Sequence, residues 1–362
     1  MSIEWLIIGA GLHGAHLAIR LLERGIPSVR VVDPAGFFET WRTRTSRLAM
    51  SHLRSPSVHN IGVRPMDLEN FAGRRRGRFR GIYARPRLDL FNDHCDHLVK
   101  TYGLERLLIQ DRVTRLDLQS GRAKAQLESG STVSAEKVVL ALGSPEPARP
   151  DRLKHHPHVF DDDWQPPNPR GSATVVGGGI SAVQLALSLS ESGIDVELVS
   201  RHRIREANFD SDPCWLGPTC MDSFSRVESM RSRRALIRKA RNRGTVPPDI
   251  KRALSRAKQQ KRVRLRTSQH LDGLTGPVLL ATGFATGRPG GELVEDLVQR
   301  QGLPVAPCGF PILSPTLRWD DRLWVCGALA ELELGPVARN IAGARRAADR
   351  IVGGTQRSRS AA

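Results

Sequence analysis

The sequence predicts an α/β protein built from two similar strand–turn–helix–strand units. The first observation is a repeat, because the glycine-rich turn at positions 9–11 recurs at positions 177–179. The second is the setting of each turn, which follows a short apolar run and precedes a segment with helical spacing of apolar residues. The third is an apolar run ended by glycine, which occurs at 138–143 and again at 278–283. The 362 residues are enough for two cores of ordinary domain size.

The two units agree in the order and length of their predicted elements. In the first, residues 5–8 are predicted as a buried strand, 12–24 as an amphipathic helix ended by Gly25, and 29–32 as a second strand. In the second, the corresponding segments are 173–176, 180–192 and 196–199, and Gly193 ends the helix. Between the units, Leu88–Tyr102 is predicted as a helix.

The first turn has the spacing of a dinucleotide-binding fingerprint. Gly9, Gly11 and Gly14 lie between a strand and a helix, and Asp33 stands at the end of the next strand, at the distance from Gly14 that the fingerprint requires. Glycines let a pyrophosphate approach the backbone, and the helix N-terminus offers free N–H groups. Asp33 is suited to accept hydrogen bonds from ribose hydroxyls and to repel a 2′-phosphate. The alternative is a strand-to-helix turn that binds nothing.

The second turn differs from the first in ways that favour NADPH over NADH. Gly177 and Gly179 are followed by Ser181 and by Ala182, which takes the place of the third glycine. Arg201 follows Ala182 at the same spacing as the acid of the first unit follows its third glycine. A guanidinium there can form two hydrogen bonds to a ribose 2′-phosphate. Because 55 of the 362 residues are Lys or Arg, a basic residue at this position also occurs by chance.

These motifs resemble those of NADPH-dependent flavoprotein monooxygenases, and most of all the bacterial lysine and ornithine N-hydroxylases and the flavin-containing monooxygenases. The resemblance rests on the two turns, on Thr40–Trp41 and on the run Leu280–Phe284. It implies FAD at Gly9, Gly11, Gly14 and Asp33, and NADPH at Gly177, Gly179, Ser181, Ala182 and Arg201. It also implies that Leu280–Phe284 links the domains, that Gly327–Asn340 closes over the flavin, and that Trp41, Thr282, Gly283 and Gly327 join the cofactor-binding residues.

We therefore expect two Rossmann-like dinucleotide-binding domains, with the NADP domain inserted in the FAD domain. The proline-rich stretch Ser144–Pro147 follows a buried strand and places a boundary near residue 150. The expected parts are an FAD-binding domain over 1–150 and 285–354, an NAD(P)H-binding domain over 151–284 with a basic helical insertion at about 226–266, and a disordered tail over 355–362.

The resemblance implies hydride transfer from NADPH to FAD and then transfer of one atom of molecular oxygen to a soft nucleophile such as an amine. No side chain stands out as catalytic. One alternative is an NADPH-dependent flavin reductase or dehydrogenase that inserts no oxygen. Ala328 follows Gly327 where many two-dinucleotide reductases carry aspartate, which weighs against the pyridine-disulfide type. A second alternative is a non-catalytic protein that binds nucleotides or nucleic acid.

Two segments are candidates for the substrate region. Asn208–Gly217 mixes carboxylates with a tryptophan and could line a pocket, although such aspartates are more often turn formers. His52 and Arg54 could face the flavin, and a surface loop explains them nearly as well.

Charge is concentrated in one segment of the chain. The net charge is +18, and residues 226–266 hold sixteen Lys or Arg against Glu228 and Asp249. This stretch has almost no aromatic residues, so it lacks the stacking platform of a single-strand binder. We expect a solvated basic helical face, which could also steer anionic NADPH, rather than a nucleic-acid site.

Cysteine spacing and hydropathy bear on disulfides, metal binding and the cellular compartment. The five cysteines form no C-x-x-C pair, so we expect them to pack as small hydrophobes without disulfides, and we expect no metal site. No apolar stretch is long enough to span a membrane. Because Glu4 and three early glycines do not fit a signal peptide, the expected compartment is the cytoplasm.

Overall fold

The computed structural model describes residues 2–73, 77–118, 121–168, 171–268, 271, 273–274 and 276–359. Its two main sheets confirm the predicted α/β class. The first sheet has the order β15-β16-β8-β1-β2-β5, and β6 and β7 extend it beside β8. Its strands are β1 Ile3–Ile8, β2 Val29–Val32, β5 Leu108–Ile109, β6 Val113–Asp117, β7 Ala123–Leu127, β8 Thr132–Leu140, β15 Arg318–Asp320 and β16 Leu323–Val325.

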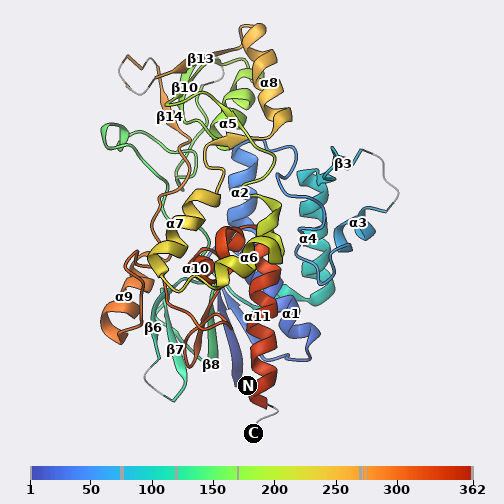
Figure 1. Ribbon diagram of the computed structural model, residues 1–362, viewed down its shortest axis with the longest axis vertical. Helices are drawn as coiled ribbons and strands as arrows, with labels where there is room; N and C mark the ends of the chain where they lie inside the picture. Colours follow the sequence, from blue (N-terminus) through green and yellow to red (C-terminus); the bar gives the residue numbers. More distant parts are fainter. Residues whose placement is uncertain are drawn as a thin grey trace.

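The second sheet is parallel throughout and has the order β13-β10-β9-β14. Its strands are β9 Ser172–Val176, β10 Asp195–Ser200, β13 Val263–Thr267 and β14 Val278–Leu280. In the sequence, all four strands come after β8 and before β15 and β16, which return to the first sheet. This order is expected for an inserted unit. Figure 1 shows this sheet at the top of the molecule and the first sheet at the bottom.

Helices cover both sheets and fill the region between them. The helices of the first part are α1 Leu12–Glu23, α2 Glu39–Arg47, α3 Asp67–Ala72, α4 Leu88–Tyr102, η1 Leu104–Leu107 and η2 Asp151–Leu153. Those of the second part are α5 Ile180–Glu191, η3 Pro213–Leu216, α6 Pro218–Ser225, α7 Met230–Ala240 and α8 Pro248–Gln259. The remaining ones are α9 Gly291–Gln301, η4 Gly327–Ala330, α10 Glu331–Leu334, η5 Gly335–Arg339 and α11 Ile341–Arg359. Two short pairs complete the fold, β3 Phe79–Arg80 with β4 Arg85–Pro86, and β11 Arg205–Glu206 with β12 Thr245–Val246.

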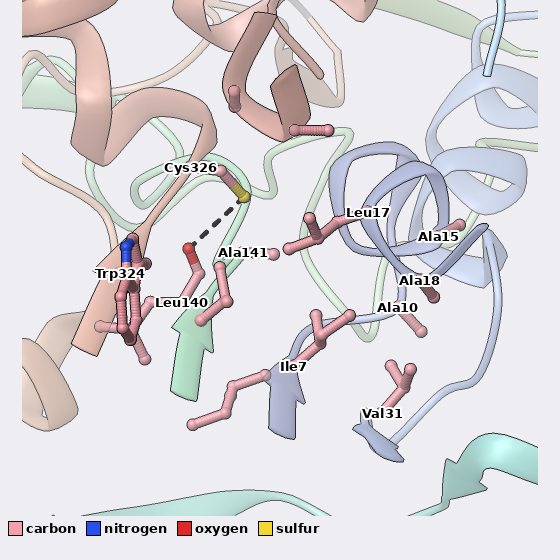
Figure 2. Packing of buried hydrophobic residues seen from close by; sticks show 14 of the residues in the cluster. Ile7, Ala10, Ala15, Leu17, Ala18, Val31, Leu140, Ala141, Trp324 and Cys326 are labelled. Carbon is pink, nitrogen blue, oxygen red and sulfur yellow. Dashed lines mark hydrogen bonds between the residues drawn. The ribbon is translucent and has the colours of Figure 1, made fainter. Parts of the chain in front are cut away.

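The core of the first domain lies between its parallel strands and helices α1 and α11. Ile7, Val31 and Leu140 stand on three neighbouring strands and have no exposed surface or almost none. Figure 2 shows them beside α1, which presents Leu17 to the same core. Burial on both faces explains why these strands are continuous apolar runs instead of alternating ones.

The two connections between the sheets run side by side. The N–H of Ala148 donates to the carbonyl of Gly283 at 2.9 Å, and the N–H of Ala285 donates to Glu146 at 2.9 Å. The hydroxyl of Thr282 also donates to the carbonyl of Ala148. The chain therefore leaves the first sheet and returns to it at one place.

An arginine of the basic segment ties the inserted part to the C-terminal part. Arg233 in α7 donates to the carbonyls of Val227 at 2.7 Å and Leu332 at 3.0 Å, and it forms an ion pair with Glu333. Its neighbour Arg234 is buried and pairs with Glu331 in α10. The expected solvated face is therefore wrong for these two arginines, because α10 brings carboxylates and free carbonyl groups against them.

The structure corrects two further expectations. Cys214 and Cys220 form a disulfide with a Cα–Cα distance of 5.3 Å, because η3 and the first turn of α6 bring them together. The backbone of residues 355–359 continues α11 instead of starting a disordered tail, and residues 360–362 lie outside the described range. Gly354 lets this helix pass close to Thr316, since a Cβ there would lie 2.6 Å from the threonine Cγ2.

Cys95 and Cys326 are buried without a disulfide partner, as expected. Within the described part of the chain, no helix is both long and apolar enough to cross a bilayer, and no group of three or more metal-ligating side chains is found there.

Buried histidines, of which His16, His94 and His158 are the most enclosed, should make the stability of the fold depend on pH. Burial lowers the pKa of His16, His94 and His158 from 6.5 to about 4. Since the unfolded chain takes up protons first as the pH falls, stability that is complete above pH 6.5 is lost between pH 6.5 and 4. Lowering the pH from about 7.5 to about 5.5 should reduce the free energy of unfolding by about 1 kcal/mol for each histidine. Urea denaturation checks this, and an unchanged pH slope in His94→Gln would contradict it.

Candidate functional site

The first glycine turn is pressed against the end of β8. The N–H of Gly9 donates to Val32 at 2.8 Å, and the N–H of Ala141 donates to Ile8 at 2.8 Å. Gly9 has a φ of +109°, and a Cβ on it would lie 2.4 Å from the carbonyl oxygen of Ala141. Only glycine allows this turn to follow the neighbouring strand so closely.

The other two glycines of this turn have opposite surroundings. A Cβ at Gly14 would lie 1.9 Å from the carbonyl oxygen of Gly9, so the absence of a side chain lets α1 pack onto the turn. At Gly11, no heavy atom of the described chain beyond its neighbours comes within 4 Å of such a Cβ. The open side of the turn is therefore at the N-terminus of α1, where free N–H groups favour a phosphate. This arrangement fits the pyrophosphate of a dinucleotide.

Asp33 holds the turn in shape. Its Oδ2 accepts from the N–H of Ala10 at 2.8 Å, and its Oδ1 accepts from Ala35 at 2.9 Å and Gly36 at 3.0 Å. The side chain is only partly buried. A carboxylate has about four acceptor positions, so these contacts leave acceptor capacity for a ribose hydroxyl.

The second turn repeats the geometry of the first. The N–H of Gly177 donates to Val199 at 2.9 Å, and the N–H of Ala281 donates to Val176 at 2.9 Å. Gly177 has a φ of +154°, and a Cβ on it would again lie 2.4 Å from an alanine carbonyl, that of Ala281. Ala182, in the place of the third glycine, is fully buried, whereas Ser181 in the first turn of α5 is partly exposed.

The second turn has another part of the chain close to its open side, and arginines stand beside it. A Cβ on Gly179 would lie 3.5 Å from the Cα of Gly244, in the loop that follows α7. The guanidinium of Arg205 donates to the carbonyl of Arg243 at 2.6 Å in the same loop. Arg201 is exposed, and its side chain forms neither a hydrogen bond nor an ion pair with the described residues. Two facing glycines beside several arginines fit a phosphate-bearing ligand.

His13 is a residue of the site that the sequence reasoning did not single out. Its Nε2–H donates to the carbonyl of Asn340 at 3.1 Å, so Nδ1 is the acceptor nitrogen. Nδ1 is buried without a hydrogen-bond partner among the described residues, and a Cβ on Gly327 would lie 3.8 Å from it. Burial lowers the pKa of His13 to about 4, so the ring is neutral at physiological pH. Its position inside the fingerprint was the available signal.

The remaining predicted cofactor residues lie at different distances from the turns. Thr282 and Gly283 directly follow Ala281, which contacts the second turn, and they form part of the paired connections. Gly327 begins η4 and faces His13. Trp41 in α2 donates through its indole N–H to Asn92 in α4 at 3.1 Å, and nothing described brings it against either turn.

The two candidate substrate segments meet each other. Arg54 donates to the carbonyls of Ala207 and Phe209 at 2.8 Å each, so it joins the first domain to the inserted one. His52 is buried, and its backbone forms an isolated antiparallel β-bridge with that of Arg87. In the segment 208–217, Asp210 forms an ion pair with Arg241 at 2.7 Å, and Trp215 stands against Gly335.

Comparison with known proteins agrees with this geometry. A family model described as FAD-NAD(P)-binding matches residues 6–145, which contain the first turn and Asp33. No curated protein sequence matches the chain. Among solved structures, the fold is that of flavoproteins with two dinucleotide-binding domains.

Three of these solved structures cover almost the whole chain. An FAD-bound cadaverine monooxygenase of desferrioxamine biosynthesis from Erwinia amylovora has a TM-score of 0.72 and 18% identity, over 97% of this chain and 94% of its own. An ornithine hydroxylase from Pseudomonas aeruginosa has a TM-score of 0.69 and 17% identity, over 98% of each chain. A bacillithiol disulfide reductase from Bacillus cereus has a TM-score of 0.62 and 15% identity, over 98% of each. At these identities, the likeness shows a shared fold.

The contrast between Gly11 and Gly14 can be tested with two substitutions. Gly11→Val adds a side chain to open space at the turn, so we expect only the loss of a good N-cap residue, about 1 kcal/mol or less, and FAD binding weakened by about tenfold or more. Gly14→Ala places a methyl group against the carbonyl of Gly9, so we expect it to destabilise the apoprotein by about 3 kcal/mol. Denaturation and flavin titration measure the two effects. Equal destabilisation by both substitutions would contradict this account of the turn.

Proposed function

We propose that the protein is an FAD- and NADPH-dependent monooxygenase that hydroxylates an amine. The observation that carries this proposal is the pair of equivalent glycine turns, each pressed against an alanine carbonyl at the end of a neighbouring strand. The shared fold with a cadaverine monooxygenase and an ornithine hydroxylase supports the choice of an amine and of molecular oxygen as substrates.

In this proposal, residues 1–150 and 285–354 form the FAD domain. Gly9, Gly11 and Gly14 admit the FAD pyrophosphate, and Asp33 accepts from its ribose. FAD supplies the electron-transfer and oxygen chemistry when bound. The segment from Gly327 to Asn340 closes over it. His13 is held by the carbonyl of Asn340 and offers Nδ1 as a neutral acceptor beside Gly327.

Residues 151–284 form the NADPH domain in this proposal. Gly177 and Gly179 admit the NADPH pyrophosphate, while Ser181 and Ala182 begin the helix whose N-terminus faces it. Arg201 forms a charge-assisted pair with the 2′-phosphate, which its exposed position permits. Thr282 and Gly283 hold the connection beside this turn, and Trp41 fixes α2 against α4.

A second candidate function is an NADPH-dependent reductase that inserts no oxygen. The observation in its favour is the disulfide between Cys214 and Cys220, together with the shared fold with a bacillithiol disulfide reductase. This candidate and the monooxygenase use the same cofactor turns and differ in the electron acceptor.

Turnover measurements separate the two candidates. With FAD-loaded protein, NADPH should bleach the visible flavin absorption without oxygen, and air with an amine should give one hydroxylated amine for each oxygen consumed. Cadaverine, lysine and ornithine are the first amines to test. NADPH oxidation that yields peroxide or a reduced disulfide, and no hydroxylated amine with any substrate, would favour the reductase. A protein that neither binds FAD nor oxidises NADPH would contradict both.

The role of Arg201 predicts the choice of nicotinamide cofactor. Arg201→Ala removes the charge expected to pair with the 2′-phosphate, so the Kd of NADPH should rise by about tenfold or more while that of NADH stays the same. Lys258→Ala, at an exposed position in α8, is the matched control for loss of one positive charge. If Arg201→Ala raised the Kd of NADPH and that of NADH equally, Arg201 would not be the residue that pairs with the 2′-phosphate.

A further inference from the structure

Five arginines gather where α7, the loop after it and η5 meet. Glu331 contacts both Arg234 and Arg339, and Arg238 and Arg241 stand at the end of the same helix as Arg234. Burial in the first place, and then the neighbouring arginines, lower the pKa of Arg241 and of Arg243. We call these residues the arginine cluster: Arg234, Arg238, Arg241, Arg243 and Arg339.

The carboxylates beside the arginine cluster do not balance its charge. Glu331 is shared, since it pairs with Arg234 and also accepts from Arg339 at 2.6 Å. Asp210 accepts from Nη2 of Arg241 at 2.7 Å. Within the described residues, no carboxylate forms an ion pair with the exposed Arg238 or Arg243. Five positive charges therefore face two negative ones.

Arg241 also has unused hydrogen-bonding capacity. Its side chain is 15% exposed, and its Nε and Nη1 are buried without a partner among the residues described. Burial and the neighbouring arginines lower its pKa to about 10. Buried donors without partners and close like charges both destabilise the protein, and an oxyanion would relieve both.

The arginine cluster lies between the two glycine turns. Arg243 directly precedes Gly244, which faces Gly179 of the second turn. Arg339 directly precedes Asn340, whose carbonyl holds His13 of the first turn. Ligands bound at the two turns would approach each other here. Figure 1 shows α7 and α10 in the middle of the molecule, between the two sheets.

We propose that the arginine cluster is an oxyanion site that binds either a carboxylate of the amine substrate or a phosphate of NADPH. The identity of these two ligands rests on the proposed function. Guanidinium groups suit both, because their planar N–H pairs match the oxygen atoms of carboxylates and phosphates. A carboxylate at this place would favour an amino acid over a simple diamine.

Binding measurements on FAD-loaded protein test the site without requiring turnover. Lysine and cadaverine are matched probes because they differ only by a carboxylate, and NADPH is the third. Arg243→Gln changes an exposed residue and should not affect folding, while Arg241→Gln removes the buried donors. Arg252→Gln in α8, exposed and outside the cluster, is the control.

A tenfold or larger loss of affinity for lysine, with cadaverine unchanged, would assign the arginine cluster to a substrate carboxylate. The same loss for NADPH, with both amines unchanged, would assign it to a cofactor phosphate. Unchanged affinities in both variants, or no binding of any of the three probes by the parent protein, would overturn the proposal.

These outcomes are distinct from failure of the proposed function. If the parent protein hydroxylates an amine and neither arginine variant changes any affinity, the monooxygenase stands and the oxyanion site falls. If the parent protein hydroxylates no amine but Arg243→Gln weakens NADPH binding, the site stands without the monooxygenase.

Discussion

The architecture depends on one close contact that is made twice. At Gly9 and at Gly177, the backbone of a strand-to-helix turn touches the carbonyl group of an alanine just past the end of the neighbouring strand, and no Cβ fits between them. The contact fixes where each turn ends and where its helix begins. It also places the strand end, and with it the connection that leaves the sheet, beside the glycine turn. Packing of the sheet and formation of the binding turn are therefore the same event.

This constraint explains why the sequence predicted so much of the fold. The turns, their flanking apolar runs and the closing runs at 138–143 and 278–283 are local patterns, and they predicted β1, α1, β2 and their counterparts closely. The roles of single residues in the site depend on distant partners and could not be predicted in this way. The ring of His13 is oriented by a hydrogen bond to the carbonyl of Asn340, which lies near the opposite end of the chain. The disulfide between Cys214 and Cys220 depends on the packing of two short helices.

The surroundings of the charged residues in the basic segment 226–266 also could not be predicted from local sequence patterns. By composition the segment is a charged stretch that water should solvate, and several of its arginines are in fact exposed. Arg233 and Arg234 are instead buried against α10, because that short helix carries Glu331 and Glu333. One arginine can donate to carbonyl groups and to a carboxylate together, so Arg233 and Arg234 pair the polar groups that meet at this junction. Charge in this segment thus holds parts of the protein together.

The paired connections at 146–148 and 283–285 have a consequence for how the two parts of the protein are held together. Since the two segments of the junction are joined by backbone hydrogen bonds, the points where the inserted part departs and returns are neighbours in space. Among the described residues, every other tie between the inserted part and the rest of the protein is made by side chains, such as Arg233 and Arg234 against α10 and the core that Phe224 and Ile237 share with Phe310. A substitution at these contacts should therefore change how the two parts are held together without changing where the chain crosses between them.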